Sequence, residues 1–205
     1  MTGHASLHRH GGRVFCVAGL GNPGKKYQST RHNVGFRAVA GLASKIASNA
    51  SFDEKFSCQF IKTKYEGLDL LIAAPQLYMN RSGDALVPLI RYFRVEPDHL
   101  IVIYDELDLA PGVMRAKRGG GTAGHRGLTD IVEKFGTDDF FRIRVGIGHP
   151  REFGGGDVGD YVLAPARGDD AVLLEQSCVR SAEAALSLMT SGIEITQREF
   201  HRTPK

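Results

Sequence analysis

The chain has 205 residues, of which 42% are hydrophobic and 24% charged, and its formal net charge is +3. This composition excludes an intrinsically disordered or collagen-like chain. No apolar run reaches the roughly 18 residues that a membrane-spanning helix needs, and the polar N-terminus lacks a signal-peptide pattern. We expect a flexible N-terminal extension over residues 1–13 and a single domain over residues 14–205.

The charge is unevenly distributed along the chain. Residues 1–126 carry 17 lysines and arginines against 10 aspartates and glutamates, whereas residues 127–205 carry 9 against 13. The basic first part suits a polyanionic partner, although a solvated surface with a chance asymmetry gives the same count. Three cysteines without C-x-x-C spacing favour a reducing cytoplasm over a disulfide framework.

The apolar patterns predict strands and helices that alternate along the chain. In order, we expect a strand over 14–20, a helix over 32–48, a strand hairpin over 55–65 and 69–75, and a helix over 83–93. There follow a strand over 100–107, an edge strand over 113–118, a helix over 126–136, a strand over 141–148, a Gly-rich loop over 151–160, and a helix capped by Asp169 that ends at Gly192. This order indicates an α/β domain with a mixed, largely buried sheet, whose site should lie at the carboxyl ends of strands.

The segment Gly19–Gly24 reads GLGNPG and fits the dinucleotide-binding fingerprint G-x-G-x-x-G. That fingerprint needs a helix that begins at once, so that its N-terminus meets the pyrophosphate. Here Pro23 and the polar residues 25–31 delay the helix, so we interpret the glycines as a tight turn and keep nucleotide binding as a minor alternative. A turn does not explain Asn22, a polar side chain at the mouth of a strand.

Two residues together indicate acid–base chemistry. His32 lies near the start of a predicted helix, and Asp105 and Asp108 lie near the end of a predicted buried strand. A carboxylate bound to one imidazole nitrogen fixes the tautomer and makes the other nitrogen a better base. Taken singly, the histidine is more simply explained as a helix cap and each aspartate as a turn residue.

Further polar residues cluster at predicted loops and strand ends. Asn80 lies at a loop-to-helix junction, Lys117 precedes the glycines 119–121, and Arg142 and Arg144 share one face of a strand. The glycine run could approach a phosphate, but no Gly-Lys-Ser/Thr follows it as in a Walker loop. The histidines and cysteines lack metal-ligand spacing, so we expect no metal.

Five segments, taken in order, closely resemble the bacterial peptidyl-tRNA hydrolases. They are VAGLGNPGKKYQSTRHNVGF (17–36), PQLYMNRSG (75–83), YDELDLAPG (104–112), KRGGGTAGHRGL (117–128) and FRIRVGIGHP (141–150). The resemblance implies a single α/β domain with a twisted mixed sheet flanked by helices, and a cytoplasmic monomer. It also implies an enzyme that, without a cofactor, hydrolyses the ester between a peptide and the terminal ribose of tRNA.

Matched position by position, the resemblance also implies residue roles. His32 matches the general base, Asp105 the carboxylate that keeps that base oriented, and Asn22 the amide associated with a preference for N-blocked substrates. The residues that hold the peptide and the terminal nucleotide are matched by Tyr27, Tyr78 and Asn80. The basic residues that clamp the terminal phosphate of the acceptor stem are matched by Lys117 and Arg144.

One position departs from the family pattern. Many members carry Asn where this chain has Arg126, and Arg only donates hydrogen bonds and brings a permanent charge. We therefore expect Arg126 to contact RNA phosphate and to change the tRNA contacts. The alternative function is that of a catalytically silent RNA-binding relative, as in some plant organelle splicing cofactors. The joint presence of Asn22, His32, Asn80 and Asp105 favours the enzyme.

Overall fold

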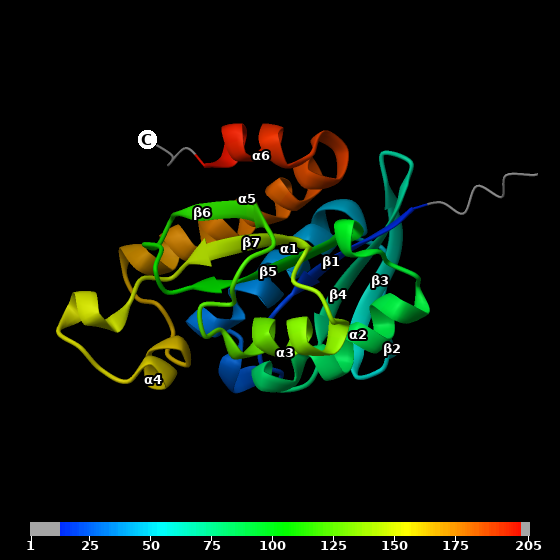
Figure 1. Ribbon diagram of the computed structural model, residues 1–205. Coiled ribbons are helices and arrows are strands. Elements are labelled where there is room, and N and C mark those ends of the chain that lie inside the picture. The colour runs from blue at the N-terminus through cyan, green and yellow to red at the C-terminus, as the bar shows by residue number, and fades with distance from the viewer. Residues whose placement is uncertain (1–12, 202–205) are drawn as a thin grey trace, which may run out of the picture.

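The computed structural model describes residues 13–201, so the predicted extension over residues 1–13 lies outside the described residues except for Arg13. A seven-stranded mixed sheet in the order β2-β3-β4-β1-β5-β7-β6 forms the centre (Figure 1). Its strands are β1 (Val14–Gly19), β2 (Asp53–Lys55), β3 (Cys58–Tyr65), β4 (Leu68–Pro75), β5 (Leu100–Glu106), β6 (Met114–Arg118) and β7 (Phe141–Gly146). The four inner strands β4, β1, β5 and β7 are parallel, whereas β2, β3 and β6 pair antiparallel at the two edges.

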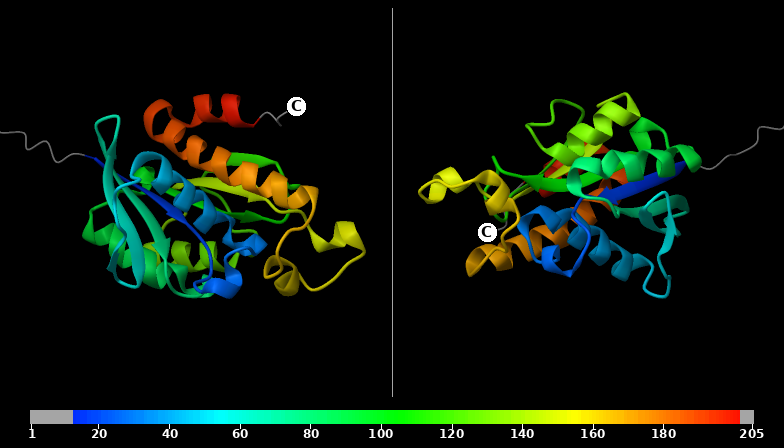
Figure 2. Two further views of the ribbon diagram at one scale, coloured as in Figure 1. Left: turned by 180° about the vertical axis from the view of Figure 1, so that it is seen from behind. Right: turned by 90° about the horizontal axis from the view of Figure 1, so that it is seen from below.

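Helices cover both faces of the sheet (Figure 2). On one face lie α1 (Val34–Ile46) and α5 (Asp169–Ser191), with α6 (Ile193–Phe200) beside α5, and on the other lie α2 (Ser82–Tyr92) and α3 (Arg126–Phe135). Ile101 and Ile103 of β5 pack into the first layer, and Val102 and Tyr104 into the second. A strand buried on both faces needs a continuous apolar run, which is why this segment was recognisable in the sequence.

The predicted α/β architecture is confirmed, including the edge position of β6. Four details of the prediction were wrong. Residues 53–55 form β2, so Lys55 does not belong to β3. The segment 151–160 is not wholly a loop, because the 3-10 turn Pro150–Phe153 and the start of α4 (Val158–Val162) lie in it.

The other two errors concern the C-terminal helices. The N-cap of α5 is Gly168, and Asp169 is already the first helical residue. Gly192 ends α5 but also begins α6, which the sequence analysis did not predict. No helix in the described part of the chain combines the length and the hydropathy needed to cross a bilayer.

Glycines bring the start of α1 directly against the ends of β1 and β5. A Cβ built on Gly19 would lie 2.1 Å from the carbonyl oxygen of Gly35, and a Cβ on Gly35 would lie 2.4 Å from that of Ile103. This contact of backbone with backbone positions the 3-10 turn Arg31–Asn33, which precedes α1, at the carboxyl edge of the sheet. His32 owes its place to that turn.

The same packing accounts for the GLGNPG segment. A Cβ on Gly21 would lie 2.6 Å from the ring of Phe36, and of its three glycines only Gly24 has a positive φ. Two 3-10 turns separate the segment from α1. The first glycines therefore serve close packing rather than a tight turn, and no helix N-terminus begins at once to receive a pyrophosphate, as nucleotide binding would require.

The close approach at Gly35 predicts a matched pair of stability effects. Gly35→Ala should lower the free energy of unfolding by about 1–3 kcal/mol, because the new methyl group has no space. Gly41→Ala in the same helix meets nothing within 4 Å and should be neutral or stabilising by up to about 1 kcal/mol. Urea denaturation measures both, and equal effects of the two substitutions would contradict the packing account.

Candidate active site

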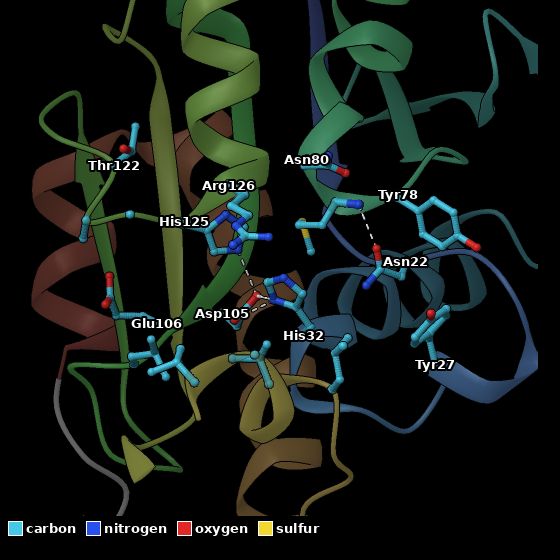
Figure 3. Close-up of a pocket in the computed structure, with 18 of the residues that line it drawn as sticks. Asn22, Tyr27, His32, Tyr78, Asn80, Asp105, Glu106, Thr122, His125 and Arg126 are labelled. Atoms are coloured by element: carbon cyan, nitrogen blue, oxygen red, sulfur yellow. Dashed lines mark hydrogen bonds and ion pairs between the residues drawn. The ribbon is translucent and has the colours of Figure 1, made fainter. Parts of the chain in front are cut away.

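A pocket of about 590 Å³ opens at the carboxyl ends of β1, β4 and β5. Seven of the nine predicted site residues line it, namely Asn22, Tyr27, His32, Tyr78, Asn80, Asp105 and Arg126 (Figure 3). The other two lie outside the lining, Lys117 on the edge strand β6 and Arg144 on the neighbouring strand β7. Asp108, the other candidate carboxylate, is exposed and pairs with Arg151 at 2.7 Å.

The centre of the pocket is a carboxylate held between two imidazoles. Nδ1 of His32 lies 2.8 and 2.9 Å from the two carboxylate oxygens of Asp105, and Nε2 of His125 lies 3.0 Å from one of them. The Asp105 side chain is 3% exposed, whereas those of His32 and His125 are 14% and 8% exposed. Asp105 is therefore sequestered, and His32 is the more accessible of the two rings.

Asp105 stays ionised in this setting. Burial alone would raise its pKa, but the positive charge and the hydrogen bonds that His32 and His125 can supply outweigh burial and hold the pKa well below its usual range. A carboxylate with a depressed pKa keeps its charge at neutral pH and loses it only under strongly acidic conditions. The negative charge is thus present whenever His32 is neutral.

Hydrogen bonds fix the tautomers of both rings. Nδ1 of His125 accepts the backbone N–H of Leu128 at the start of α3, so its Nε2 carries the proton and donates to Asp105. His32 likewise donates from Nδ1, because an ionised carboxylate only accepts. Nε2 of His32 consequently keeps a free lone pair, which is the form that a general base needs.

Asn22 presents an amide group to the pocket in a fixed orientation. Its backbone N–H and C=O form two 2.9 Å hydrogen bonds with the side chain of Asn33, and its Oδ1 accepts the N–H of Met79 at 2.7 Å. With Oδ1 engaged, the side-chain NH2 has no partner in the described part of the chain. It can donate to an oxygen of a bound molecule.

The two walls of the pocket differ in chemistry. Tyr27 and Tyr78 lie on one side of His32, with ring centroids 6.3 Å apart and nearly perpendicular planes (Figure 3). The other side has Glu106, and Arg126 begins α3 above it. An aromatic wall suits apolar groups, whereas the exposed Arg126 guanidinium suits an anion.

Arg144 is partly engaged by an ion pair within the protein, which the sequence did not indicate. Its Nε donates to the buried carboxylate of Glu106 at 2.9 Å, which leaves its two Nη groups without a partner among the described residues. Lys117 has no ion pair in residues 13–201, and burial followed by the charges of Arg142 and Arg144 lowers its pKa. These cations form a basic surface beside the pocket.

Two imidazoles and a carboxylate are also donors that divalent metals accept. The ligand atoms of His32, Asp105 and His125 all lie within 4.8 Å of one another. A metal ion would have to displace the hydrogen bonds that both rings donate to Asp105. The hydrogen-bonded arrangement satisfies all three groups, so absence of a metal stays our prediction.

Three contributors to the site were not predicted. His125 lies in the glycine-rich segment 117–128, and no role was predicted for it, for Glu106 beside Asp105 or for Asn33 beside His32. The available signal for these residues was their position. Each is a polar residue near a candidate catalytic residue, at the end of a buried strand or at the start of a helix. This signal became informative only once the partners in space were known.

Comparison with known proteins agrees with this geometry. The family model for peptidyl-tRNA hydrolase matches residues 16–205. Peptidyl-tRNA hydrolases of Bordetella petrii and Rhodococcus jostii are 37% and 40% identical to the chain, over 92% and 90% of its length and 97% and 96% of theirs. The crystal structure of peptidyl-tRNA hydrolase from Acinetobacter baumannii superposes with a TM-score of 0.85 at 34% identity, covering 93% of this chain and 95% of that one.

Proposed function

The chain belongs to the peptidyl-tRNA hydrolase family and hydrolyses peptidyl-tRNA, and from this premise we propose that His32 is the general base of the reaction. The observation that carries this assignment is the pair of hydrogen bonds from His32 and His125 to the ionised Asp105. They leave Nε2 of His32 as the unprotonated nitrogen of a partly accessible ring in the pocket. Asp105 is the residue that keeps it so.

The proposed reaction begins with a water molecule held by Nε2 of His32. The imidazole takes a proton from the water as its oxygen attacks the ester carbonyl carbon, and Asp105 stabilises the resulting imidazolium. The tetrahedral intermediate then collapses, the bond to the ribose oxygen breaks, and that oxygen receives the proton from His32. The products are a free tRNA hydroxyl group and a peptide carboxylic acid, which releases its proton to solvent to become a carboxylate, and His32 returns to its neutral form.

Asn22 is placed to stabilise the charge that develops during attack. Its free NH2 group can donate to the carbonyl oxygen as it becomes an oxyanion, and Asn80 lines the same pocket. Because the contact with Met79 fixes the amide beforehand, little reorganisation is needed in the transition state. One such donor contributes about 3–4 kcal/mol in other hydrolases.

The two walls suit the two halves of the substrate. We propose that Tyr27, Tyr78 and Asn80 hold the peptide and the terminal nucleotide, since aromatic rings and amides bind both. Lys117 on the edge strand β6 and Arg144 on the neighbouring strand β7 clamp the terminal phosphate of the acceptor stem through free cationic groups. The ester then lies between them, at His32.

We also propose that the enzyme works without a cofactor, in the cytoplasm and as a monomer. The site needs no cofactor, because an ester is already activated and a positioned base and water suffice. A tRNA substrate and three free buried cysteines favour the cytoplasm. We propose a monomer, as the family resemblance implies.

The general-base role predicts the outcome of a simple comparison. His32→Ala should lower kcat/KM for an N-blocked aminoacyl-tRNA by about 10²–10⁴-fold, because Ala cannot accept a proton from water. Binding of the tRNA to the variant, measured by filter retention, should persist and serves as the control for folding.

The same assay with EDTA tests the prediction that the site holds no metal, since wild-type turnover should survive chelation. Retained turnover in His32→Ala would remove His32 from the role. Tight tRNA binding by the wild type without any cleavage would indicate the silent RNA-binding relative instead.

Arg126 predicts a change in tRNA binding rather than in chemistry. Arg126→Asn should raise KM for the tRNA and reduce the slope of log binding against log salt by about 1, because one phosphate contact is lost. The matched control is Arg94→Asn, which removes an exposed arginine outside the pocket at a φ of 55° that Asn tolerates. An effect on kcat alone would refute the phosphate contact.

A further inference from the structure

Arg142 is the largest fully buried side chain among the described residues, and it forms no ion pair there. It lies on β7 with no exposed surface. A guanidinium keeps its charge at any physiological pH, and burial of an unpaired charge is costly. Neither hydrophobic packing nor charge pairing therefore explains why an arginine occupies this position.

The contacts of Arg142 join two loops. Its Nη1 donates to the carbonyl oxygen of Gly121 at 2.9 Å, and its Nη2 donates to that of Asp138 at 3.0 Å. The guanidinium lies 4.9 Å from the ring centroid of Phe140, and its Nε has no partner. The planar fork thus holds the glycine run after β6 against the loop that leads into β7.

That glycine run in turn supports Lys117. The N–H of Gly119 donates to the carbonyl of Phe140 at 3.0 Å, and the N–H of Gly120 donates to the carboxylate of Asp138 at 3.0 Å. A Cβ built on Gly120 would lie 2.8 Å from Nζ of Lys117. The Lys117 ammonium therefore rests on the segment that Arg142 fixes.

The strand register places like charges side by side. Lys117 pairs directly with Arg142 across β6 and β7, and Arg115 pairs directly with Arg144. Directly opposite like charges destabilise a sheet unless something offsets them. Of these four, only Arg144 has a carboxylate partner in the described chain, so an anion bound beside Lys117 would relieve the repulsion.

We propose that Arg142 is a positioning residue for the phosphate clamp: it fixes residues 119–121 beneath Lys117 and adds a buried positive charge behind the bound phosphate. This inference rests on the proposed clamp of Lys117 and Arg144. Arg142 does not touch the substrate, because it is fully buried. Its buried charge is weakly screened by salt, so it acts on a phosphate more strongly than a surface arginine does.

The test compares an N-blocked aminoacyl-tRNA with and without the terminal phosphate of its acceptor stem. The ratio of the two kcat/KM values measures how strongly the enzyme uses that phosphate. Arg142→Met should reduce this ratio about tenfold, within the range of coupling between residues of one network. Arg142→Lys keeps the charge but loses the fork, and should give an intermediate ratio.

A purely structural role would lower both kcat/KM values equally and leave the ratio unchanged, which would overturn the inference. Arg91→Met is the matched control, because Arg91 also donates to a carbonyl, that of Lys134, and should leave the ratio at its wild-type value. If Arg142→Met does not fold, a wild-type ratio in Arg142→Lys overturns the inference instead.

Lys117→Met separates this inference from the clamp on which it rests. If Lys117→Met keeps the full phosphate dependence, the clamp itself is wrong and the role of Arg142 falls with it. If Lys117→Met loses the dependence and Arg142→Met keeps it, only the role of Arg142 is wrong. In the double variant the two losses should not add, because Arg142 acts through Lys117.

Discussion

The buried carboxylate of Asp105, accepting hydrogen bonds from two histidines, is the contact on which the site depends. Its charge is stable there only because both rings donate to it, and it fixes both rings in return. Because the rings belong to segments far apart in the chain, this contact joins the start of α1, the end of β5 and the start of α3. The chemistry and the tertiary structure are therefore coupled at one side chain.

Close packing of backbone makes that contact possible. The start of α1 reaches β5 only because Gly19 and Gly35 carry no side chains, and the turn that holds His32 follows from this approach. The backbone of Asn22 is held by the neighbouring residue of the same turn, Asn33, while the N–H of Met79 orients the Asn22 side-chain amide. A single packing feature thus sets both the base and the candidate oxyanion donor.

The charge buried behind the basic surface is stabilised in a different way from that of Asp105. Asp105 is a buried anion stabilised by the hydrogen bonds of two histidines, whereas Arg142 is a buried cation that the described residues leave without an ion pair. The arrangement at Asp105 suits a carboxylate that must orient the histidine that accepts the proton. The arrangement at Arg142 suits a site whose counter-charge arrives with the substrate, which is the case for an enzyme that acts on RNA.

Sequence reasoning recovered the features that local pattern determines. The buried run at β5 and the alternation at β7 predicted strands. The positions of His32 near a helix start and Asp105 near a strand end, together with the family resemblance, predicted that the two side chains meet. It missed His125 and Glu106, because no local pattern marks them as partners of Asp105 and Arg144, and only the fold brings these pairs together. It also missed α6. Gly192 caps the end of α5 and the start of α6, and a glycine after a helix is normally read as the end of the helical segment.

The asymmetry between Lys117 and Arg144 could not be predicted either. Both are basic residues on neighbouring strands, β6 and β7, and nothing in the local pattern distinguishes them. Only the structure gives Arg144 a carboxylate partner and leaves Lys117 on the glycine run.

The pH–rate profile of Asp105→Asn tests the central claim most directly. An Asn carries no charge and accepts only at its one carbonyl oxygen, so its NH2 group replaces the second acceptor oxygen beside Nδ1 of His32, and the imidazolium loses its stabilising charge. The account predicts a fall in kcat/KM of about 10²–10⁴-fold and an acid limb displaced to lower pH, with tRNA binding retained. An unchanged profile would show that His32 does not depend on Asp105, and the account of the site would be wrong.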